Sequence, residues 1–578
     1  MKKTWIDLLY ASLLYTLVFI VYTFPLILKF DQAFIGELHS DAPQFFWNAW
    51  HFKKSFFHPS ELFHTHDLLY PQGISLLVNS NTYIYGIAAL FCKNPYFSFN
   101  LIVALSFVLS GLGAYVLAKK YLDSRGLCLL AGFIFAFSPY KLVRLTEHYN
   151  LILTFTIPWI FLCFTQLIYL SDRKITLSSD LKKYGAFFLL FAFTVLLDYL
   201  AVFHAFYLCT AYFIALILLS IKLPNAKATF GIVVIFFLTL HFVIRGLRLL
   251  GVDDRGAFWW GGDLTAYFVP SYQSLFFYND AVQNIYASGW FYSKPFCIES
   301  VVFLGYSFII VSVFAFIYYL RNFRELSFEL RALFITLVLL AMMSIPSFRL
   351  FGKQLFNMPT SIIHFIPFFN NVRIAGRIIM LVSLVLPILS FYYLEKKIRS
   401  LQVAPVQVLN ISTAVLGLFL FFEYYPSRYQ FSGRADLPEF VYNLEKKENT
   451  SILNIPLGVK DGNKMLGYFD NKNLFFQTAH GLPITDGYAS RIQEKVFLSC
   501  EKDPGMNLLF QYSRDTSTIF EDQMFYKFSD YIKNCKVNYI IISPTHRNQR
   551  LETMIYNKLM IDREKTWEDR GYRIIKLK

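Results

Sequence analysis

The sequence predicts an α-helical polytopic membrane domain with about eleven transmembrane helices, followed by a small soluble α/β domain. Of its 578 residues, 56% are hydrophobic and only 16% are charged, whereas a soluble domain carries roughly 45–50% apolar and about 25% charged residues. The apolar excess runs from the N-terminus to about residue 424 and then stops. We therefore expect a membrane domain over residues 1–425 and a soluble α/β domain over residues 430–578.

Eleven segments are long and apolar enough to be membrane spans, since a spanning helix needs about 20 largely apolar residues. They are residues 5–28, 97–118, 126–143, 149–170, 184–199, 200–221, 228–246, 299–320, 331–347, 376–394 and 402–423. The first is too long for the apolar region of a signal peptide and lacks a small-residue cleavage site, so we expect it to be retained.

The basic residues of the loops predict the orientation of these spans, because cytoplasmic loops are enriched in Lys and Arg. One further apolar stretch, residues 76–92, contains Asn79, Asn81 and Gly86. If this stretch stays out of the bilayer and the N-terminus is cytoplasmic, every predicted inner loop is basic. Counting it as a span would move most of the basic clusters outside. We therefore place residues 76–92 at the outer interface and the C-terminal domain outside the cytoplasm.

This topology leaves three sizeable segments on the outer face, residues 29–96, 247–298 and 348–375. The C-terminal domain joins them there. It contains short apolar stretches typical of strands, at residues 451–457, 537–543 and 572–577, between helix-like and turn-rich segments. It has no glycine-rich nucleotide loop.

Charge and cysteine content bear on the remaining classes of protein. The net charge is +15, but much of the basic charge lies in short loops between spans, and no basic patch is interleaved with aromatic residues. We therefore expect no nucleic-acid partner. The seven cysteines show no metal-ligand spacing. Only Cys500 and Cys535 lie together in the polar domain, and the sequence leaves open whether they form a disulfide.

Asp41 is the candidate catalytic residue. It stands in the segment HSDAPQFFWNAWHFKKSFFHPS, residues 39–60. We predict that this segment is an interfacial helix whose aromatic side chains lie among lipid headgroups, with Lys53 and Lys54 near lipid phosphates. Asp41 with Gln44 is also a helix N-cap pattern. Residue types alone leave capping and catalysis open, and the two roles are compatible.

A row of ionisable residues follows the third span. Lys141, Arg144, Glu147 and His148 are spaced by three or four residues, so on a helix they share one face. One interpretation is an interfacial face whose charged groups reach the lipid headgroups. The other is the polar wall of a site that opens to the outside, with Glu147, His148 and Asn150 as substrate-binding residues.

Two other outer segments hold further candidates. Asp263 follows the seventh span, in the segment GGDLTAYFVP. Arg373 and Arg377 are one helical turn apart near the start of the tenth span. Two guanidinium groups at this spacing can bind a phosphate bidentately, which Lys does less well. Anchoring to lipid headgroups is the alternative role of both arginines.

Taken together, these motifs resemble the GT-C superfamily of polytopic glycosyltransferases, in particular its uncharacterised bacterial members. The resemblance covers about residues 1–425. The motifs that carry it are Asp41 with Gln44 and Trp47, Leu69-Tyr70-Pro71-x-Gly73, Ser138-Pro139-Tyr140 then His148-x-Asn150, Asp263-Leu264 with Tyr267 and Pro270, Glu299 then Leu304-Gly305-Tyr306, Arg373 with Arg377, and residues 477–481 (QTAHG) and 487–491 (GYASR) of the tail. The first outer loop departs from the frequent Asp-Asp or Glu-x-Asp pairing, since Asp41 stands beside Ser40.

The resemblance implies an enzyme of the bacterial inner membrane that transfers a hexosyl or pentosyl group, with inversion, from a polyprenyl-phosphate carrier. The acceptor would be an envelope glycan, lipid or protein on the outer face. Asp41 would be the general base, Arg373 and Arg377 would stabilise the phosphate, and Glu147 and His148 would orient the substrates. Asn150 and Asp263 are the other implied substrate-binding residues. No cofactor is implied, and the need for a divalent cation stays open.

The alternative class is a non-enzymatic transporter or flippase of lipid-linked sugars or envelope polymers. Such a protein is expected to contain internal repeats and charged or broken helices near the membrane midplane. This sequence has no internal repeat, and its ionisable residues gather at one predicted face. That asymmetry favours a site at the outer surface. A third class, an assembly protein whose tail binds an envelope partner, also stays open.

Overall fold

The computed structural model describes residues 2–77, 79–171, 174–221, 234–235, 238–239, 241–246, 262–291, 295–366, 374–402, 404–447, 449–517, 522–561 and 563–577. The chain forms two compact units. The helical unit comprises Met1–Ile27, Val103–Leu145 and Leu151–Tyr429, and the mixed unit comprises Leu28–Ile102, Thr146–Asn150 and Gln430–Lys578. The C-terminal segment thus forms one unit with residues 28–102, which the sequence had assigned to the membrane domain.

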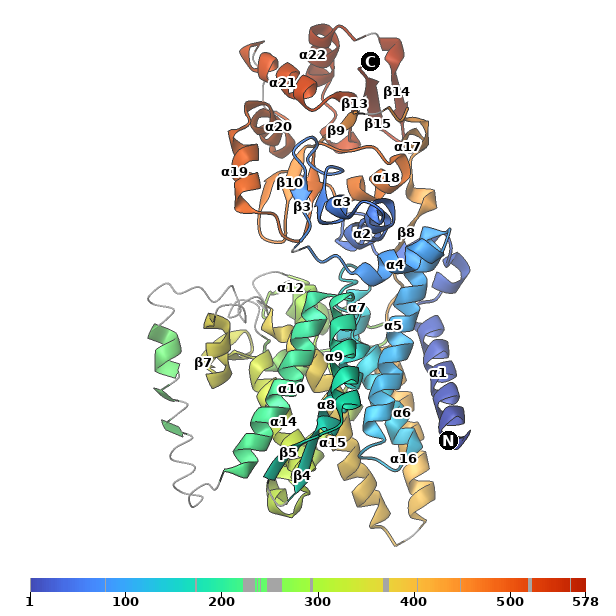
Figure 1. Ribbon diagram of the computed structural model, residues 1–578, viewed down its shortest axis with the longest axis vertical. Coiled ribbons are helices and arrows are strands. Elements are labelled where there is room, and N and C mark those ends of the chain that lie inside the picture. Colours follow the sequence, from blue (N-terminus) through green and yellow to red (C-terminus); the bar gives the residue numbers. More distant parts are fainter. Residues whose placement is uncertain are drawn as a thin grey trace. The chain divides into compact units, whose positions relative to one another are not determined.

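Six helical stretches in the described part of the chain are long and apolar enough to cross a membrane, which indicates a multi-pass membrane protein (Figure 1). The stretches are Trp5–Tyr22 in α1 (Lys2–Tyr22), Pro95–Ala118 (α5), Arg125–Arg144 (α6, Arg125–Phe137, with α7, Pro139–Arg144), Tyr199–Ser220 (α10), Ala375–Arg399 (mainly α15, Ile379–Arg399) and Pro405–Tyr424 (α16). Ser138 and Pro139 separate α6 from α7, since proline cannot donate the hydrogen bond that a continuous helix needs.

The other predicted spans are shorter than expected. The segments 149–170, 184–199, 299–320 and 331–347 contain the helices α8 (Thr156–Leu167), α9 (Leu181–Val195), α13 (Tyr306–Arg321) and α14 (Phe328–Ser344). These helices have 12 to 17 residues and are therefore about 18–26 Å long, less than the roughly 30 Å of a hydrocarbon core. Helix α8 ends at the hairpin β4 (Ile168–Ser171)–β5 (Lys174–Leu177). The predicted span 228–246 lies largely outside the described residues.

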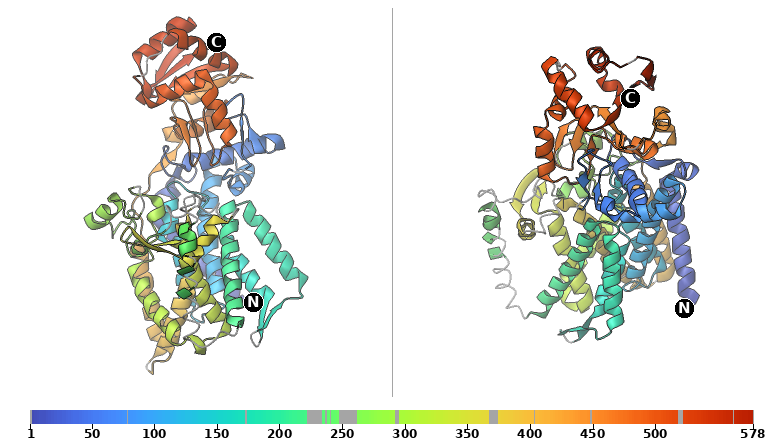
Figure 2. Two further views of the ribbon diagram at one scale, coloured as in Figure 1. Left: turned by 90° about the vertical axis from the view of Figure 1, so that its left-hand side faces the viewer. Right: turned by 45° about the horizontal axis from the view of Figure 1, so that its top comes forward.

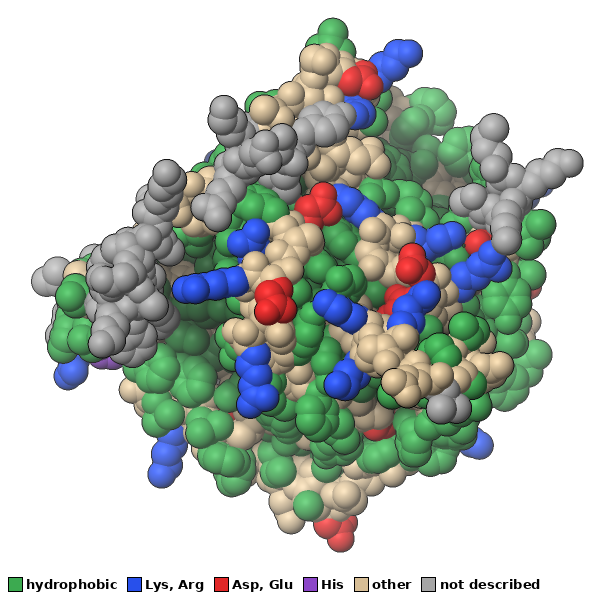
Figure 3. Space-filling model, turned by 90° about the horizontal axis from the view of Figure 1, so that it is seen from below, with side chains coloured by type: hydrophobic (Ala, Val, Ile, Leu, Met, Phe, Trp, Pro, Cys, Tyr) green, Lys and Arg blue, Asp and Glu red, His purple; other side chains and the backbone are tan. Residues whose placement is uncertain are grey.

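The loops that the sequence assigns to the inner side meet at one end of the helical unit. Ion pairs join them to one another and to α1. The pairs are Lys119 with Asp7 (3.3 Å), Arg125 with Asp7 (3.3 Å), Lys120 with Glu329 (3.6 Å) and Arg399 with Asp123 (3.6 Å). Figure 3 shows Lys and Arg side chains gathered over this end of the molecule. Their common location agrees with the positive-inside pattern of the sequence.

The mixed unit contains the predicted strands of the C-terminal segment. The strands β9 (Ser451–Ile455), β13 (Val537–Ile542), β14 (Thr566–Asp569) and β15 (Tyr572–Lys576) form a sheet of order β14-β15-β13-β9. In it β13 is parallel to β9 and antiparallel to β15. A second sheet has the order β11-β10-β12, with β10 at Gly458–Lys460, β11 at Met465–Gly467 and β12 at Gly487–Tyr488. The helices that accompany these strands (Figure 2) are α18 (Lys472–His480), α19 (Glu494–Lys502), α20 (Pro504–Arg514), α21 (Asp522–Asn534) and α22 (Gln549–Leu559). This mixed α/β region confirms the predicted class of the tail.

Strand pairing and helix packing explain why residues 28–102 belong to the mixed unit. The strand β1 (Ala33–Ile35) is antiparallel to β8 (Phe431–Gly433). Helix α2 (Ala42–Ser55) packs against α4 (Tyr83–Phe91) and against α18 (Lys472–His480). Helix α4, the core of the stretch 76–92, has nine residues and is too short to span a bilayer.

The prediction that the aromatic side chains of residues 39–60 lie among lipid headgroups is wrong for Phe45, Phe46 and Trp47. These three side chains are buried inside the mixed unit and are only 1–3% exposed. Phe46, for example, stacks on Phe34 with ring centroids 5.1 Å apart. Phe57, just beyond the helix, is 83% exposed. Hydrophobic burial within the protein therefore explains the aromatic residues at the start of α2, but not those that follow its end.

This packing predicts that one alanine substitution strongly destabilises the protein and that another has almost no effect. Phe45→Ala should lower the free energy of unfolding by about 3–5 kcal/mol, since it empties a buried aromatic site, whereas Phe57→Ala should change it by less than about 0.5 kcal/mol. Thermal unfolding of the detergent-solubilised variants, followed by tryptophan fluorescence, measures the difference. Equal transition temperatures would contradict the burial of α2.

Candidate functional site

Asp41 occupies the N-cap position of α2, but its side chain accepts no capping hydrogen bond. The hydroxyl of Ser40 accepts a bond from the backbone N–H of Ala42 instead (3.2 Å). Pro43 stands in the first turn, where its missing N–H needs no partner. The carboxylate of Asp41 is therefore not used to begin the helix, and its side chain is 28% exposed.

Four polar side chains face the carboxylate, all from the mixed unit, and one of them, Tyr488, is hydrogen-bonded to it. The amide Nδ2 of Asn471 donates to Oδ1 at 3.3 Å, and Nζ of Lys460 lies 3.7 Å from the same oxygen. The ring Nε2 of His148 is 3.9 Å from Oδ2. These distances are longer than those of strong charge-assisted hydrogen bonds, which are roughly 2.7–2.9 Å. The carboxylate oxygens thus keep capacity to accept a hydrogen bond from a ligand.

The short strands β10 and β12 of the second sheet position Lys460 beside Asp41. Lys460 ends β10 and is the register partner of Tyr488 in the parallel strand β12. The ammonium group of Lys460 lies over the ring of Tyr488, 4.7 Å from its centroid. Burial and the nearby negative charge of Asp41 raise the pKa of the Tyr488 hydroxyl well above its usual value. This tyrosine is therefore neutral and can act as a hydrogen-bond donor next to Asp41.

Backbone contacts hold His148 beside the start of α2. The hydroxyl of Ser40 also donates to the carbonyl oxygen of Thr146 (3.2 Å), and the hydroxyl of Tyr149 donates to the carbonyl oxygen of Ile35. Of the other predicted residues in this segment, Glu147 is half-buried and Asn150 is 7% exposed. The structure thus brings Asp41 and His148 together and places Glu147 and Asn150 next to His148 in the chain.

The residues Lys460, Asn471 and Tyr488 were not predicted from the sequence. Of the three, only Tyr488 lies in a tail motif that the sequence marked, and both tail motifs contact α2 directly. In the first, Oε1 of Gln477 accepts a hydrogen bond from the indole of Trp47 (2.7 Å). In the second, which contains Tyr488, Oγ of Ser490 accepts one from the amide of Gln44 (2.9 Å).

A second polar cluster lies in the helical unit. Glu299 binds two arginines: Nη2 of Arg144 lies 2.7 Å from its Oε2, and Nε of Arg377 lies 3.1 Å from its Oε1. Arg144 and Glu299 are 0% and 4% exposed, and Arg377 is 13% exposed. Two guanidinium groups on one carboxylate leave a net charge of about +1 in a largely buried place.

This cluster lies far from the basic loops of the helical unit. Arg377 precedes α15, and Arg399 ends that helix beside Asp123. Twenty-two residues of helix correspond to roughly 33 Å. The cluster therefore occupies the end of the helical unit opposite to the basic loops. The other predicted phosphate ligand, Arg373, lies outside the described residues.

Asp263 is a helix cap in the structure. It is fully buried at the N-cap of a short helix (Leu264–Tyr267), where Oδ1 accepts a bond from the N–H of Thr265 (2.9 Å). Its Oδ2 accepts one from the N–H of Gly352 (2.8 Å). Both oxygens are thus bonded to the backbone of the helical unit.

The cysteines and carboxylates of the described residues form neither a disulfide nor a metal cluster. Cys500 and Cys535 are buried free thiols. In the ranges that the structure describes, no group of three or more His, Cys, Asp and Glu side chains is placed to hold a metal ion. Asp41 belongs to no such group in those ranges, and its carboxylate faces the ammonium group of Lys460. This donor set does not fit a divalent cation.

The fold is similar to that of a solved oligosaccharyltransferase. The apo form of the oligosaccharyltransferase from Archaeoglobus fulgidus has a TM-score of 0.50 and 12% sequence identity, over 95% of this chain and 70% of that chain. The same organism's AglB in complex with an inhibitory peptide and a dolichol-phosphate has a TM-score of 0.47 and 11% identity, over 96% and 71%. Its complex with Zn and sulfate has a TM-score of 0.48 and 12% identity, over 95% and 69%. At these identities the similarity concerns the fold alone, and the apo structure shows that this chain has a fold like that of the oligosaccharyltransferase.

The sequence also matches a known protein family. Residues 12–417 match the family described as "Domain of unknown function (DUF6311)", which is more than half of the chain. The protein belongs to this family. No curated protein matches the sequence.

The structure predicts that the Asp41 carboxylate contributes little to the stability of α2. Asp503 provides a matched control, because it also precedes a helix with proline in its first turn, and its Oδ1 accepts bonds from the N–H groups of Gly505 and Met506 (both 2.9 Å). Asp503→Ala should cost about 0.5–2 kcal/mol of unfolding free energy, the usual value of a cap, and Asp41→Ala distinctly less. Thermal unfolding of both variants measures this difference. A larger loss for Asp41→Ala would make its carboxylate a structural group.

Proposed function

We propose that this protein is a membrane glycosyltransferase that moves a sugar from a polyprenyl-phosphate carrier to an acceptor in the cell envelope. The similarity of its fold to an oligosaccharyltransferase supports this class of enzyme. The helices that can span a membrane support a lipid-linked donor, since such a donor is presented at the bilayer. The proposed place of reaction is the outer face of a bacterial inner membrane.

The observation that carries the proposal is the state of Asp41. A carboxylate that begins a helix usually accepts the backbone bonds of the first turn. Here it is turned instead toward Lys460, Asn471 and His148, and it is partly open to solvent. A partly exposed carboxylate with long contacts, fixed at the end of a rigid helix, suits a general base.

In the proposed reaction, Asp41 accepts the proton of the acceptor hydroxyl. The hydroxyl oxygen forms a bond to the anomeric carbon of the sugar, and the bond from that carbon to the carrier phosphate breaks. The phosphate leaves with the electron pair of that bond. Because attack and departure take place on opposite sides, the anomeric configuration is inverted. Asn471 would hold Oδ1 in place, and Lys460 would balance the charge of the carboxylate.

We further propose that the arginines of the helical unit stabilise the leaving phosphate. The cluster of Arg144, Glu299 and Arg377 has a net positive charge, and positive groups placed where negative charge develops lower the barrier. Arg373 would join Arg377 in this role. His148, with Glu147 and Asn150, would orient the acceptor. Asp263 has no part in the proposal because the backbone uses both its oxygens, and no step involves a metal ion.

The proposal predicts that Asp41→Asn lowers transfer by about 10²- to 10⁴-fold, the usual contribution of a general base. Mass spectrometry of the envelope glycans and lipids of a deletion strain should show one missing sugar and an accumulated lipid-linked donor. Membranes from strains that carry each variant are then assayed with the accumulated donor.

Asp530→Asn is the matched control, because Asp530 is an exposed carboxylate on α21 (Asp522–Asn534) of the same unit. It should transfer sugar like the wild type. Unchanged glycans in the deletion strain would contradict the proposed function. Near-normal transfer by Asp41→Asn would contradict the role of Asp41 alone.

A further inference from the structure

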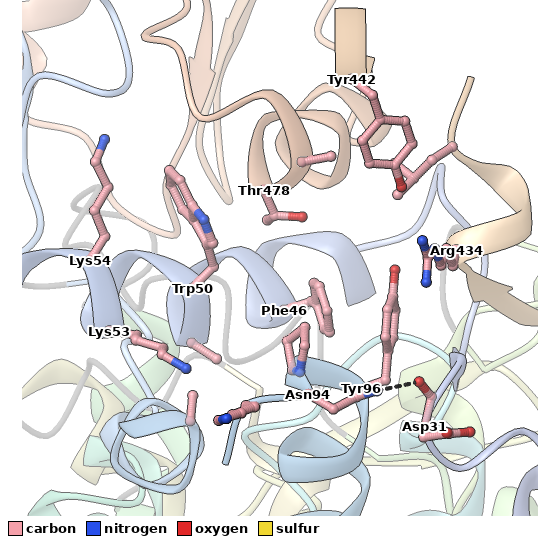
Figure 4. A pocket seen from close by; sticks show the side chains of 16 residues that line it. Asp31, Phe46, Trp50, Lys53, Lys54, Asn94, Tyr96, Arg434, Tyr442 and Thr478 are labelled. Atoms are coloured by element: carbon pink, nitrogen blue, oxygen red, sulfur yellow. Dashed lines mark hydrogen bonds between the residues drawn. The ribbon is translucent and has the colours of Figure 1, made fainter. Parts of the chain in front are cut away.

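The mixed unit contains a pocket of about 510 Å³ beside α2, separate from Asp41 (Figure 4). One face of α2 forms its floor, with Phe46, Ala49, Trp50 and Lys53 at helical spacing. The opposite wall comes from Thr478 and Ala479, near the end of α18, and from Tyr442 in α17 (Phe440–Asn443). Trp50 is nine residues beyond Asp41, which is roughly 14 Å along the helix axis. The pocket therefore lies at a different position along α2 from Asp41.

The charge of the pocket is strongly positive. Four cationic side chains line it, Lys53, Lys54, Lys93 and Arg434, against one carboxylate, Asp31. Lys54 is paired with Asp67 (2.5 Å), and the other three are exposed at the rim. Clustered exposed cations attract anionic ligands.

Aromatic rings and neutral polar groups form the rest of the lining. Trp50, Tyr96 and Tyr442 offer ring faces together with N–H and O–H groups. Figure 4 shows the Tyr96 ring next to Arg434, with Tyr442 above them and Thr478 facing α2. Pyranose rings have apolar C–H faces that pack on aromatic rings, and hydroxyl groups that bond to such polar side chains. The volume lies in the usual range for sites that bind small ligands, about 300–1,000 Å³, and far exceeds the need of a single phosphate group.

We propose that this pocket binds an acidic saccharide, that is, a short run of sugars that carries carboxylate or phosphate groups. The rim cations would pair with its charges, and Trp50 and Tyr442 would pack on its rings. The assignment of this saccharide as the acceptor of the transfer rests on the proposed function. Binding itself does not depend on catalysis.

Isothermal titration of the full-length protein in detergent tests the proposal with three probes. Trigalacturonic acid should bind, and the affinity should fall as the salt concentration rises. Maltotriose, which is neutral, should bind at least about tenfold more weakly. Glycerol 1-phosphate stands for the headgroup of an anionic phospholipid and should not compete with trigalacturonic acid.

Substitutions in the pocket identify the binding place. Lys93→Gln and Arg434→Gln should each raise the dissociation constant about threefold, the size expected for one exposed ion pair. Trp50→Leu should raise it about tenfold, since it removes an aromatic face. Lys502→Gln removes an exposed cation from α19 (Glu494–Lys502), outside the pocket, and should bind like the wild type. Thermal unfolding confirms that each variant is folded.

The outcomes separate this inference from the proposed function. No binding of trigalacturonic acid, or binding that the three pocket variants leave unchanged, overturns the inference. Binding of glycerol phosphate in its place, with the same dependence on the variants, also overturns it and assigns the pocket to a lipid headgroup. If trigalacturonic acid binds while the deletion strain keeps normal glycans, the saccharide-binding inference is supported and the proposed transferase function is contradicted.

Discussion

The position of α2 is the constraint on which the mixed unit depends. One face of this helix bonds to residues more than 400 positions later in the chain, through Trp47 with Gln477 and Gln44 with Ser490. The aromatic residues between these contacts are buried. The polar bonds fix the register of the helix, and the buried rings supply most of the favourable free energy, at roughly 25 cal/mol per Å² of apolar surface. Asp41 can meet Lys460 and Asn471 only when this packing is complete.

The carboxylates of the mixed unit illustrate two different uses of one functional group. Asp67 is 6% exposed and binds both His51 and Lys54, at 3.3 and 2.5 Å. Burial alone would raise its pKa, but the bonds to His51 and Lys54 outweigh burial and hold the pKa below its usual value. The carboxylate of Asp67 therefore has a structural role. Asp41 has longer contacts and more exposure, so its lone pairs are available to a substrate hydroxyl.

The sequence predicted those features that depend on local composition. The apolar β-branched runs at 451–457, 537–543 and 572–577 became β9, β13 and β15, because such residues favour strands in any buried sheet. The membrane character of the chain followed from the same kind of evidence. The lengths of the helices did not, since the apolar residues 151–155 form a turn before α8 rather than its first turns. Apolar composition shows that a residue is buried but not where a helix begins.

Features that depend on contacts between distant residues could not be predicted. The aromatic residues of α2 suit a lipid interface as well as a protein core, and only the contact with α18 decides between them. The ion pair of Arg377 with Glu299, which lies 78 positions earlier in the chain, is a second contact of this kind. The residues around Asp41 are His148, Lys460, Asn471 and Tyr488, which lie far from Asp41 in the chain. Of the last three, which come from the tail, only Tyr488 lies in a motif that resembles the GT-C group, and the resemblance gives no physical reason for its place.

The central claim is that the carboxylate at position 41 faces the outer solution, where a lipid-linked donor would be used. Labelling of intact cells with a membrane-impermeant maleimide tests it directly, in a chain whose native cysteines are replaced. Asp41→Cys should react in intact cells as completely as after lysis, and Asp530→Cys should do the same as the exposed reference in the same unit. Reaction of Asp41→Cys only after the membrane has been permeabilised would place this site in the cytoplasm and contradict the account.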